Sequence, residues 1–575
     1  MSVVSSSLGS SQVANPIEKP KPAMTVWLVA ALVGLSVAWP LLYAGLFFGP
    51  AIIIRSLTGD SYHYLAIARK AHISHIFTYD GVHVTNGFHP LWQYTIRGMF
   101  SILHLQSQES QAIAVMLLAL SAVTLGIILA SAAVIRMTNK YFLGLLLVPG
   151  LYYIVIGVHV KNLSIWAALD GMESAFSVLF GGIFFFVLSQ FTGTAAKRKF
   201  EPIAAYRALG LVLPFLILSR LDDFFILPAF LVALFLFETS ISKRITAGLW
   251  IVGPSTIAIL CYLLYNKITV GAAMPLSGGT KSGFVGFLSA YLTTAVHFPP
   301  ILDLKAYLTK KASEGPVVFS NSFRFVEVTY PFLAAAFGAL AIWKYRRKHA
   351  ESSVLFAICL YILFKTSYNF LNVHPWHQAG WYYVFITICL SVLGALALRK
   401  PWGELDTVPI AKYGIVTIYV MMMLFSASQY YASIVYPSLG GNVPQFWARR
   451  DELGKELRAD GVTGIINVDD GITAFLLDFP NMHGFAFATD VEAQRAHKAG
   501  RMLSLAYSRG INTIAGFGYM STDNPPKTDA EIRQYLRTSL GWETMSSEMD
   551  QFDFSLAYYD PVLKWPFISF KPKAR

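Results

Sequence analysis

Carboxylate, imidazole and phenol side chains are concentrated in one stretch, SLTGDSYHYLAIARKAHISHIFTYDGVHVTNGFHPLWQYTI, which runs from residue 56 to residue 96. Asp60 opens its helical part, where the helix dipole favours an ionised carboxylate. An ionised carboxylate within reach of a hydroxyl group can remove its proton as the oxygen attacks. Asp60 is therefore a candidate general base, and the alternative is that it only caps the helix. Four further side chains of this stretch are candidates for substrate binding: Tyr62, Tyr64, His89 and Trp92.

Two acidic residues form a second group in the segment AALDGMESAF, just before a later apolar run. Asp170 and Glu173 are three positions apart, a spacing that places both side chains on one face of a helix. We expect both to contact substrate, although Glu173 is equally compatible with a helix N-cap.

Basic and aromatic candidates lie near the ends of other apolar runs. Arg220 lies in LSRLDDFF, Lys281 in MPLSGGTKS and Lys365 inside an apolar run. Ionisable residues in or beside membrane segments are costly and usually functional. We therefore expect these cations, unpaired at the membrane surface, and Tyr382 to contact substrate. The alternatives are structural: Arg220 can pair with one of the aspartates that follow it, and Lys365 can extend its ammonium group to the interface.

The composition indicates a membrane protein with many spans. The chain has 575 residues, of which 55% are hydrophobic and 14% are charged, and its mean hydropathy is +0.51. A soluble domain carries about a quarter charged residues. The three cysteines lie inside apolar runs, which predicts buried thiols and neither a disulfide nor a metal site. The net charge of +12 comes from Lys and Arg clusters in short loops between apolar runs. Cytoplasmic loops of membrane proteins are rich in Lys and Arg, so no nucleic-acid partner is needed to explain the charge.

The apolar runs and basic loops together predict about eleven transmembrane helices and a cytoplasmic N-terminus. The predicted spans lie near 26–48, 111–135, 141–158, 173–191, 204–219, 223–238, 247–265, 329–343, 353–371, 379–397 and 409–431. This count places every basic loop on the cytoplasmic side only if the segment 89–103 does not cross the membrane. We expect that segment to lie along the outer interface as an amphipathic helix. A second juxtamembrane helix is expected at 60–72.

Three domains follow from these patterns. Residues 1–25 are polar and predict a disordered cytoplasmic tail, and residues 26–437 form the transmembrane domain with outer loops at 49–110 and 266–328. Residues 438–575 alternate helical patterns with short apolar runs, which is typical of an α/β domain. The fold class is therefore mostly α, with a small extracytoplasmic α/β domain at its C-terminal side.

Several motifs resemble those of bacterial GT-C membrane glycosyltransferases. The stretch GDSYHYLAIARK…FTYDGVHVTNGFHPLW resembles their first outer loop, DGMESAF resembles their second acidic motif, and MPLSGGTKS and WYYV resemble further landmarks. In that family the first loop often carries two acids where this chain has Gly59 and Asp60. NVDDGITAFLLDFPNMHGFA matches the family more loosely.

The resemblance implies a polytopic GT-C fold and inverting transfer of a hexosyl or pentosyl group from a polyprenyl-phosphate sugar. The acceptor would be a glycan, a lipid or a protein, and the reaction would take place at the outer face of the plasma (inner) membrane. It also implies an architecture shared with oligosaccharyltransferase catalytic subunits, protein O-mannosyltransferases and aminoarabinose transferases. Asp60 would be the base, and Asp170 and Glu173 would be the second acidic motif. The segment from His89 to Trp92 would form part of the active-site wall.

The expected chemistry needs no cofactor. Arg220, Lys281 or Lys365 can stabilise the leaving phosphate, so no metal is required, and the sequence gives no support for a divalent cation. The faces of Tyr62, Tyr64, Trp92 and Trp381 are expected to receive the sugar. A transporter or flippase of a lipid-linked sugar is the main alternative, but it predicts charges near the bilayer midplane and paired repeats. A receptor or scaffold leaves the first outer loop unexplained.

The topology can be tested with single cysteines at Arg198, Arg346 and Lys455 and a membrane-impermeant thiol reagent on intact cells. We expect labelling at position 455 alone, because the basic loops should be cytoplasmic and the C-terminal domain extracytoplasmic. Labelling at 198 or 346, or protection at 455, would contradict this arrangement.

Overall fold

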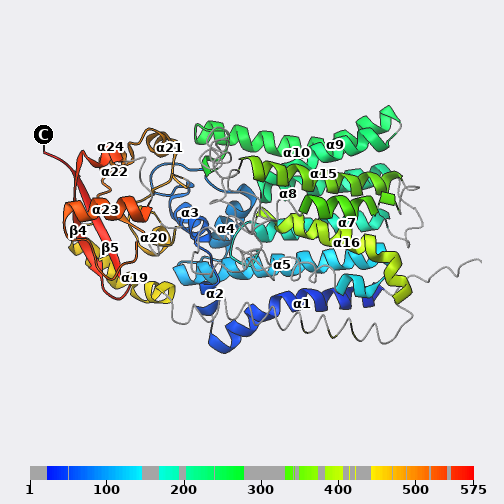
Figure 1. Cartoon of the computed structure of the whole chain (residues 1–575), viewed down its shortest axis with the longest axis horizontal. Coiled ribbons are helices and arrows are strands. Elements are labelled where there is room, and N and C mark those ends of the chain that lie inside the picture. The colour runs from blue at the N-terminus through cyan, green and yellow to red at the C-terminus, as the bar shows by residue number, and fades with distance from the viewer. Residues whose placement is uncertain are drawn as a thin grey trace, which may run out of the picture.

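The structure is a computed structural model, and it divides the chain into a bundle of long helices and a small domain that contains a sheet (Figure 1). It describes residues 23–49, 51–145, 168–192, 202–238, 240–277, 330–340, 342–343, 349–372, 382–405, 414, 417, 421, 442–468, 471–486, 488–516, 520–540 and 546–574. The fold is mostly helical, as the sequence predicts.

Apolar helices make up the bundle, and the chain is a multi-pass membrane protein. The described helices include α1 (Ala23–Phe48), α5 (Gln108–Thr138), α7 (Ser174–Thr192), α8 (Pro202–Ser219), α9 (Ile226–Phe237), α10 (Ile241–Thr269), α15 (His349–Asn372) and α16 (Val384–Leu405). Four stretches of the described chain are long and apolar enough to cross a membrane: Met24–Phe48, Gln108–Thr138, Ser174–Phe191 and Ile241–Thr269. The predicted spans near 141–158 and 409–431 lie largely outside the described residues, as does most of the predicted outer loop 266–328.

Short helices occupy the segment predicted as the first outer loop, called the outer loop below, at one end of the bundle, called the α3 end (Figure 1). They are α2 (Ala51–Arg55), α3 (Ser61–Ser74) and α4 (Pro90–Ile102), and the last two confirm the helices predicted at 60–72 and 89–103. Pro90 stands in the first turn of α4, where its missing N–H costs nothing. At 13 residues α4 is about 20 Å long, too short for a hydrocarbon core of about 30 Å.

The C-terminal domain confirms the predicted α/β pattern. Its strands are β1 (Ile465–Asn467), β2 (Asn481–His483), β3 (Thr513–Ala515), β4 (Phe552–Asp560) and β5 (Trp565–Pro572). They form one sheet in the order β2-β1-β3-β5-β4, parallel at β2-β1-β3 and antiparallel at β3-β5-β4. Its helices are α19 (Asn442–Ala459), α20 (Ile472–Leu476), α21 (Val491–Lys498), α22 (Met502–Ser508), α23 (Asp529–Leu540) and α24 (Ser546–Met549).

The C-terminal domain packs against the first outer loop through direct polar contacts. The indole nitrogen of Trp447 donates to the hydroxyl of Tyr62 at 3.2 Å, and the hydroxyl of Thr85 donates to the carbonyl of Thr489 at 2.7 Å. Gly471 comes closest to α3, because a Cβ atom there would lie 2.7 Å from the backbone nitrogen of His63. The α3 helix therefore lies between the bundle and the C-terminal domain.

Gly471→Ala is expected to loosen this packing and lower the melting temperature. Gly471 has a φ of +93°, which costs an L-residue about 1–2 kcal/mol, and the added methyl group also collides with backbone atoms of α3. Gly461→Ala is the matched control, since its φ of +79° carries the same strain with nothing within 4 Å of the added Cβ. Thermal unfolding and limited proteolysis measure both variants, and equal losses would show that the close approach to α3 is unimportant.

Candidate active site

Asp60 stands at the N-terminus of α3, and its backbone angles are already helical, with φ −59° and ψ −28°. Its side chain makes no capping hydrogen bond to the helix. Asp60 therefore occupies the N-cap position of α3 without capping the helix through its side chain. Its negative charge lies close enough to Asp170 to affect the titration of that carboxyl group, and Thr58 joins the two segments by donating its N–H to the Asp170 carbonyl at 3.2 Å.

Asp170 is a buried carboxyl group, with 2% of its surface exposed. Its Oδ1 atom accepts a hydrogen bond from the backbone N–H of Met172 at 3.0 Å, and among the described residues its Oδ2 atom has no hydrogen-bond partner. Burial, and after it the negative charge of Glu173, raises the pKa of Asp170 well above its ordinary value. This carboxyl group therefore keeps its proton at pH values where an exposed aspartate has lost it.

A tight turn holds Asp170 in place. The indole nitrogen of Trp92 donates to the carbonyl of Gly171 at 3.1 Å, and Gly171 has a φ of +83°. A Cβ atom at this glycine would approach the side chain of Leu57 to 2.5 Å. The NGFHPLW turn and the DGMES motif, which the sequence analysis singled out separately, are thus in direct contact.

Glu173 joins four segments of the chain. Its Oε1 atom accepts a hydrogen bond from Arg220 at 2.9 Å and lies 3.5 Å from Nε2 of His89. The Tyr64 hydroxyl also hydrogen-bonds to Glu173. The Nδ1 atom of His89 accepts the N–H of Leu221 at 3.3 Å, which leaves the proton of a neutral imidazole on Nε2, facing Glu173.

The ionic contacts continue into the bundle through Leu221–Phe225, a short 3-10 helix between α8 and α9. Arg220 lies 2.9 Å from Asp222, and Lys365 lies 3.4 Å from the other oxygen of Asp222. Lys365 also pairs with Asp223, which accepts a hydrogen bond of 2.5 Å from the Tyr361 hydroxyl. Lys365 and Asp223 are both fully buried.

These contacts correct the expectation that Arg220 and Lys365 are unpaired cations. Each is buried and bonded to carboxylates, so Arg220 forms the ion pair that the sequence left open, and Lys365 does not extend to the interface. Two cations face three carboxylates in this network, namely those of Glu173, Asp222 and Asp223. Such a balance stabilises the cations and offers no excess positive charge to a phosphate.

The aromatic candidates have different surroundings. Trp92 is fully buried and packs edge-on against Phe176 with ring centroids 4.8 Å apart. Tyr62 is 2% exposed and packs against Phe475 of the C-terminal domain. The expectation that these two rings present a face to a sugar is therefore wrong, because other side chains cover them. Tyr382 lies under the guanidinium group of Arg220 at 4.2 Å. Lys281 and Trp381 lie outside the described residues.

Sequence reasoning missed a polar group at the junction of α3 with the C-terminal domain. The ring of His63 lies 3.1 Å from the Tyr79 hydroxyl through Nδ1, Asn467 donates to the same hydroxyl at 2.8 Å, and His483 packs against His63 with ring centroids 4.8 Å apart. One signal was available in the sequence: His63 follows Asp60 by three positions, a spacing that places both side chains on the same face of a helix. Nothing in the local sequence points to their partners in the sheet.

One group within the described residues has the spacing of cation ligands: Asp80, His83 and Asp490, whose ligand atoms lie within 4.8 Å of one another. Arg509 lies 2.6 Å from Asp490 and 3.5 Å from Asp80. Backbone N–H groups of residues 82 and 83 also bind Asp80. An ion-paired contact between the outer loop and the C-terminal domain accounts for the group.

Comparison with known proteins gives no family assignment. No family model matches the chain, and no curated protein matches it. Three similar solved structures are of the oligosaccharyltransferase of Archaeoglobus fulgidus. The AglB complex with an inhibitory peptide and a dolichol-phosphate has 12% identity and a TM-score of 0.45, covering 95% of this chain and 74% of that one. The apo form has 14% identity and a TM-score of 0.44, covering 86% and 69%.

The third structure is the same enzyme tethered to an acceptor peptide, with 13% identity and a TM-score of 0.45, covering 96% of this chain and 74% of that one. Oligosaccharyltransferases are among the enzymes with which the sequence resemblance predicts a shared architecture. These sequence identities and TM-scores are too low to carry an argument about function. A function must therefore be argued from the residues of the site.

Lys365→Met is expected to destabilise the protein strongly, because it leaves Asp223 buried without a counter-ion. Breaking one partner of a buried ion pair costs about 3–5 kcal/mol. The double variant Lys365→Met, Asp223→Asn should recover much of this loss, since it removes both charges. Thermal unfolding of both single variants and the double variant measures the coupling, and additive losses would contradict the pairing.

Proposed function

We propose that this protein is an inverting glycosyltransferase that moves a hexosyl or pentosyl group from a polyprenyl-phosphate donor to a glycan, lipid or protein acceptor. The observation that carries the proposal is the position of Asp60. Its carboxylate stands at the start of α3, makes no capping bond to that helix, and lies close enough to the buried carboxyl group of Asp170 to raise its pKa. The reaction would take place at the outer face of the plasma membrane.

In this mechanism Asp60 accepts the proton of the acceptor hydroxyl group as its oxygen attacks the anomeric carbon. The new C–O bond forms on the face opposite to the bond that breaks, so the configuration inverts. The polyprenyl phosphate leaves with the bonding electron pair. The positive end of the α3 dipole favours the ionised form of Asp60 that this step requires.

The raised pKa of Asp170 also favours proton removal by Asp60. Two neighbouring carboxylates that are both ionised raise the proton affinity of each other. Because burial raises the pKa of Asp170, the neutral form of Asp170 is favoured, and a neutral neighbour favours the ionised form of Asp60. This difference between the two acids suits a single general base.

The ionic network of Glu173, Arg220, Asp222, Asp223 and Lys365 is best assigned to the wall of the site. Its cations are occupied by carboxylates, so it positions α3 through Tyr64 and the His89 turn. Lys281, the third cation that the sequence offers for the donor phosphate, lies outside the described residues. We keep it as the proposed phosphate ligand on the sequence pattern alone.

We propose that the reaction needs no resident metal ion, since burial raises the pKa of Asp170 and so disfavours a second negative charge near Asp60. The rate of transfer should then be unchanged when a chelator such as EDTA is added to the assay. A loss of activity that Mg²⁺ or Mn²⁺ restores would instead assign a cation to Asp60 and Asp170.

The alternative, a flippase of a lipid-linked sugar, predicts charged groups near the midplane of the bilayer. The ionic network contacts α3 and the His89 turn, which places it at the α3 end of the bundle. This position favours chemistry at one membrane surface.

Asp60→Asn should abolish most of the transfer while preserving the fold. The amide has nearly the same size as the carboxylate but cannot accept the proton, and loss of a general base costs about 10²–10⁴-fold in rate. The measurement is sugar transfer from a polyprenyl-phosphate donor by the purified variant.

Asp451→Asn is the matched control, because Asp451 is 83% exposed on α19 of the C-terminal domain, and it should keep wild-type turnover. Melting temperatures and monodispersity report on folding. A folded Asp60→Asn variant that transfers sugar at the wild-type rate would rule out Asp60 as the base.

A further inference from the structure

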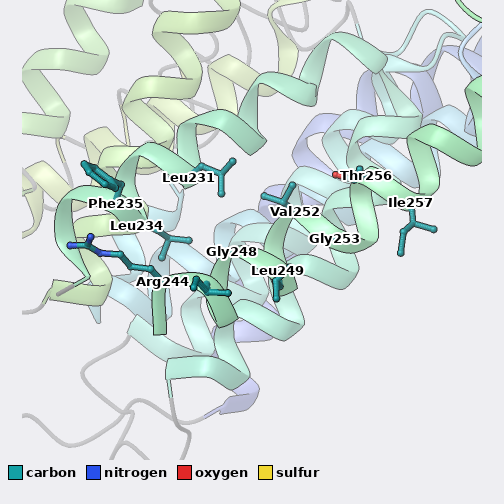
Figure 2. Close-up of a pocket in the computed structure, with 11 residues that line it drawn as sticks. Leu231, Leu234, Phe235, Arg244, Gly248, Leu249, Val252, Gly253, Thr256 and Ile257 are labelled. Carbon is teal, nitrogen blue, oxygen red and sulfur yellow. The ribbon is translucent and has the colours of Figure 1, made fainter. Parts of the chain in front are cut away.

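An open groove lies between α9 and α10 (Figure 2). Its volume is about 610 Å³, within the roughly 300–1,000 Å³ typical of ligand sites. Its lining is apolar apart from Thr256 and a single charged residue, Arg244. The groove is lined by Leu231, Leu234, Phe235, Arg244, Ile245, Gly248, Leu249, Val252, Gly253, Thr256 and Ile257.

Two glycines of α10 keep the groove open. A Cβ atom at Gly253 would meet nothing within 4 Å, and one at Gly248 would meet only the tip of Leu231 at 3.6 Å. Leu249 and Ile257 beside them are 68% and 65% exposed, although α10 is apolar enough to span a membrane. The groove therefore faces the acyl chains of the bilayer. Because Gly248 and Gly253 have no side chains, the groove has space for one acyl chain.

Arg244 supplies positive charge at one end of the groove. Its Nε atom donates to the backbone carbonyl of Glu238, and its guanidinium group lies 5.1 Å from the ring centre of Phe235. The Glu238 carboxylate accepts the N–H of Ser240 at 3.2 Å, and no carboxylate of the described chain forms an ion pair with Arg244. Lys243, next to it in the sequence, is exposed.

The charged end of the groove is far from the candidate active site. The chain just after α10 contacts the outer loop, where Asn86 donates to the carbonyl of Ala272 at 3.3 Å. The 29 residues of α10 span about 44 Å, so Arg244, in its first turn, lies at the opposite end of the bundle from α3. From Arg244 to Ile257 the helix rises about 20 Å, enough for one leaflet of about 15 Å and part of its head-group region.

We propose that this groove binds one anionic phospholipid from the membrane leaflet on the side opposite the C-terminal domain. Its phosphate contacts Arg244, and one acyl chain lies along Gly248 and Gly253. Basic pockets between membrane helices recognise anionic head groups in this way. A polyprenyl-phosphate donor is not the expected occupant, because its phosphate must reach Asp60 at the other end of the bundle. This inference goes beyond the proposed transfer reaction and does not depend on it.

The test titrates phosphatidylglycerol into the purified, delipidated full-length protein and counts bound lipids by native mass spectrometry. Gly253→Leu places a side chain in the groove, where the added Cβ atom meets nothing within 4 Å, and Arg244→Gln removes the head-group contact. Each should weaken phosphatidylglycerol binding by about tenfold, as expected for loss of a charge-assisted hydrogen bond or of the chain-binding space. Phosphatidylcholine should bind the wild-type protein more weakly than phosphatidylglycerol.

Two matched variants serve as controls. Lys243→Gln removes an exposed charge next to Arg244, and Gly98→Leu adds the same side chain to α4, where a Cβ also meets nothing within 4 Å. Both should bind phosphatidylglycerol nearly as the wild type does. Equal affinity in Arg244→Gln, Gly253→Leu and the wild type would overturn the proposal, as would equal binding of phosphatidylcholine. Displacement of phosphatidylglycerol by a polyprenyl phosphate, weakened in Gly253→Leu, would assign the groove to the donor chain instead.

Discussion

The pairing of Lys365 with Asp223 constrains the geometry of the whole α3 end. Both groups are fully buried, and a buried charge without its partner is strongly destabilising. The α15 helix, which carries Lys365, therefore cannot move away from the short 3-10 helix that carries Asp223. That helix follows Arg220, which binds Glu173, and Glu173 binds Tyr64 of α3. The position of Asp60 at the start of α3 thus depends on ionic contacts inside the bundle.

A second set of contacts acts on α3 from its other side. Trp447 binds Tyr62, and Gly471 allows the C-terminal domain to approach the backbone of His63. Tyr62 and Tyr64 are two positions apart on the same helix and have different partners, one in the C-terminal domain and one in the ionic network. Both are largely buried, so the helix has little freedom to rotate or slide. A general base benefits from such fixed placement, since proton transfer depends on its distance from the hydroxyl group.

Local features of the fold were predictable because they depend on patterns within one segment. The helix Pro90–Ile102 follows from a proline at its start and an apolar face that repeats every three to four residues. The C-terminal α/β domain follows from its alternating patterns. The partners of Lys365 were not predictable: Asp223 lies 142 residues away in sequence, and only the packing of α15 against α9 brings the two together. For the same reason the sequence assigned Trp92 and Tyr62 to a binding surface, although tertiary contacts cover both rings.

The placement of α3 also has a consequence for biosynthesis. Thr85 and Thr489, which are hydrogen-bonded in the folded protein, are separated by 404 residues. At about 5–20 residues per second, roughly 20–80 s pass between their synthesis. During this interval the segment that contains Tyr62 and Thr85 is already synthesised, while the surface of the C-terminal domain that covers Tyr62 does not yet exist. The nascent chain must keep these aromatic side chains from aggregation or misplaced contacts, and the site can form only when the C-terminal domain has folded onto it.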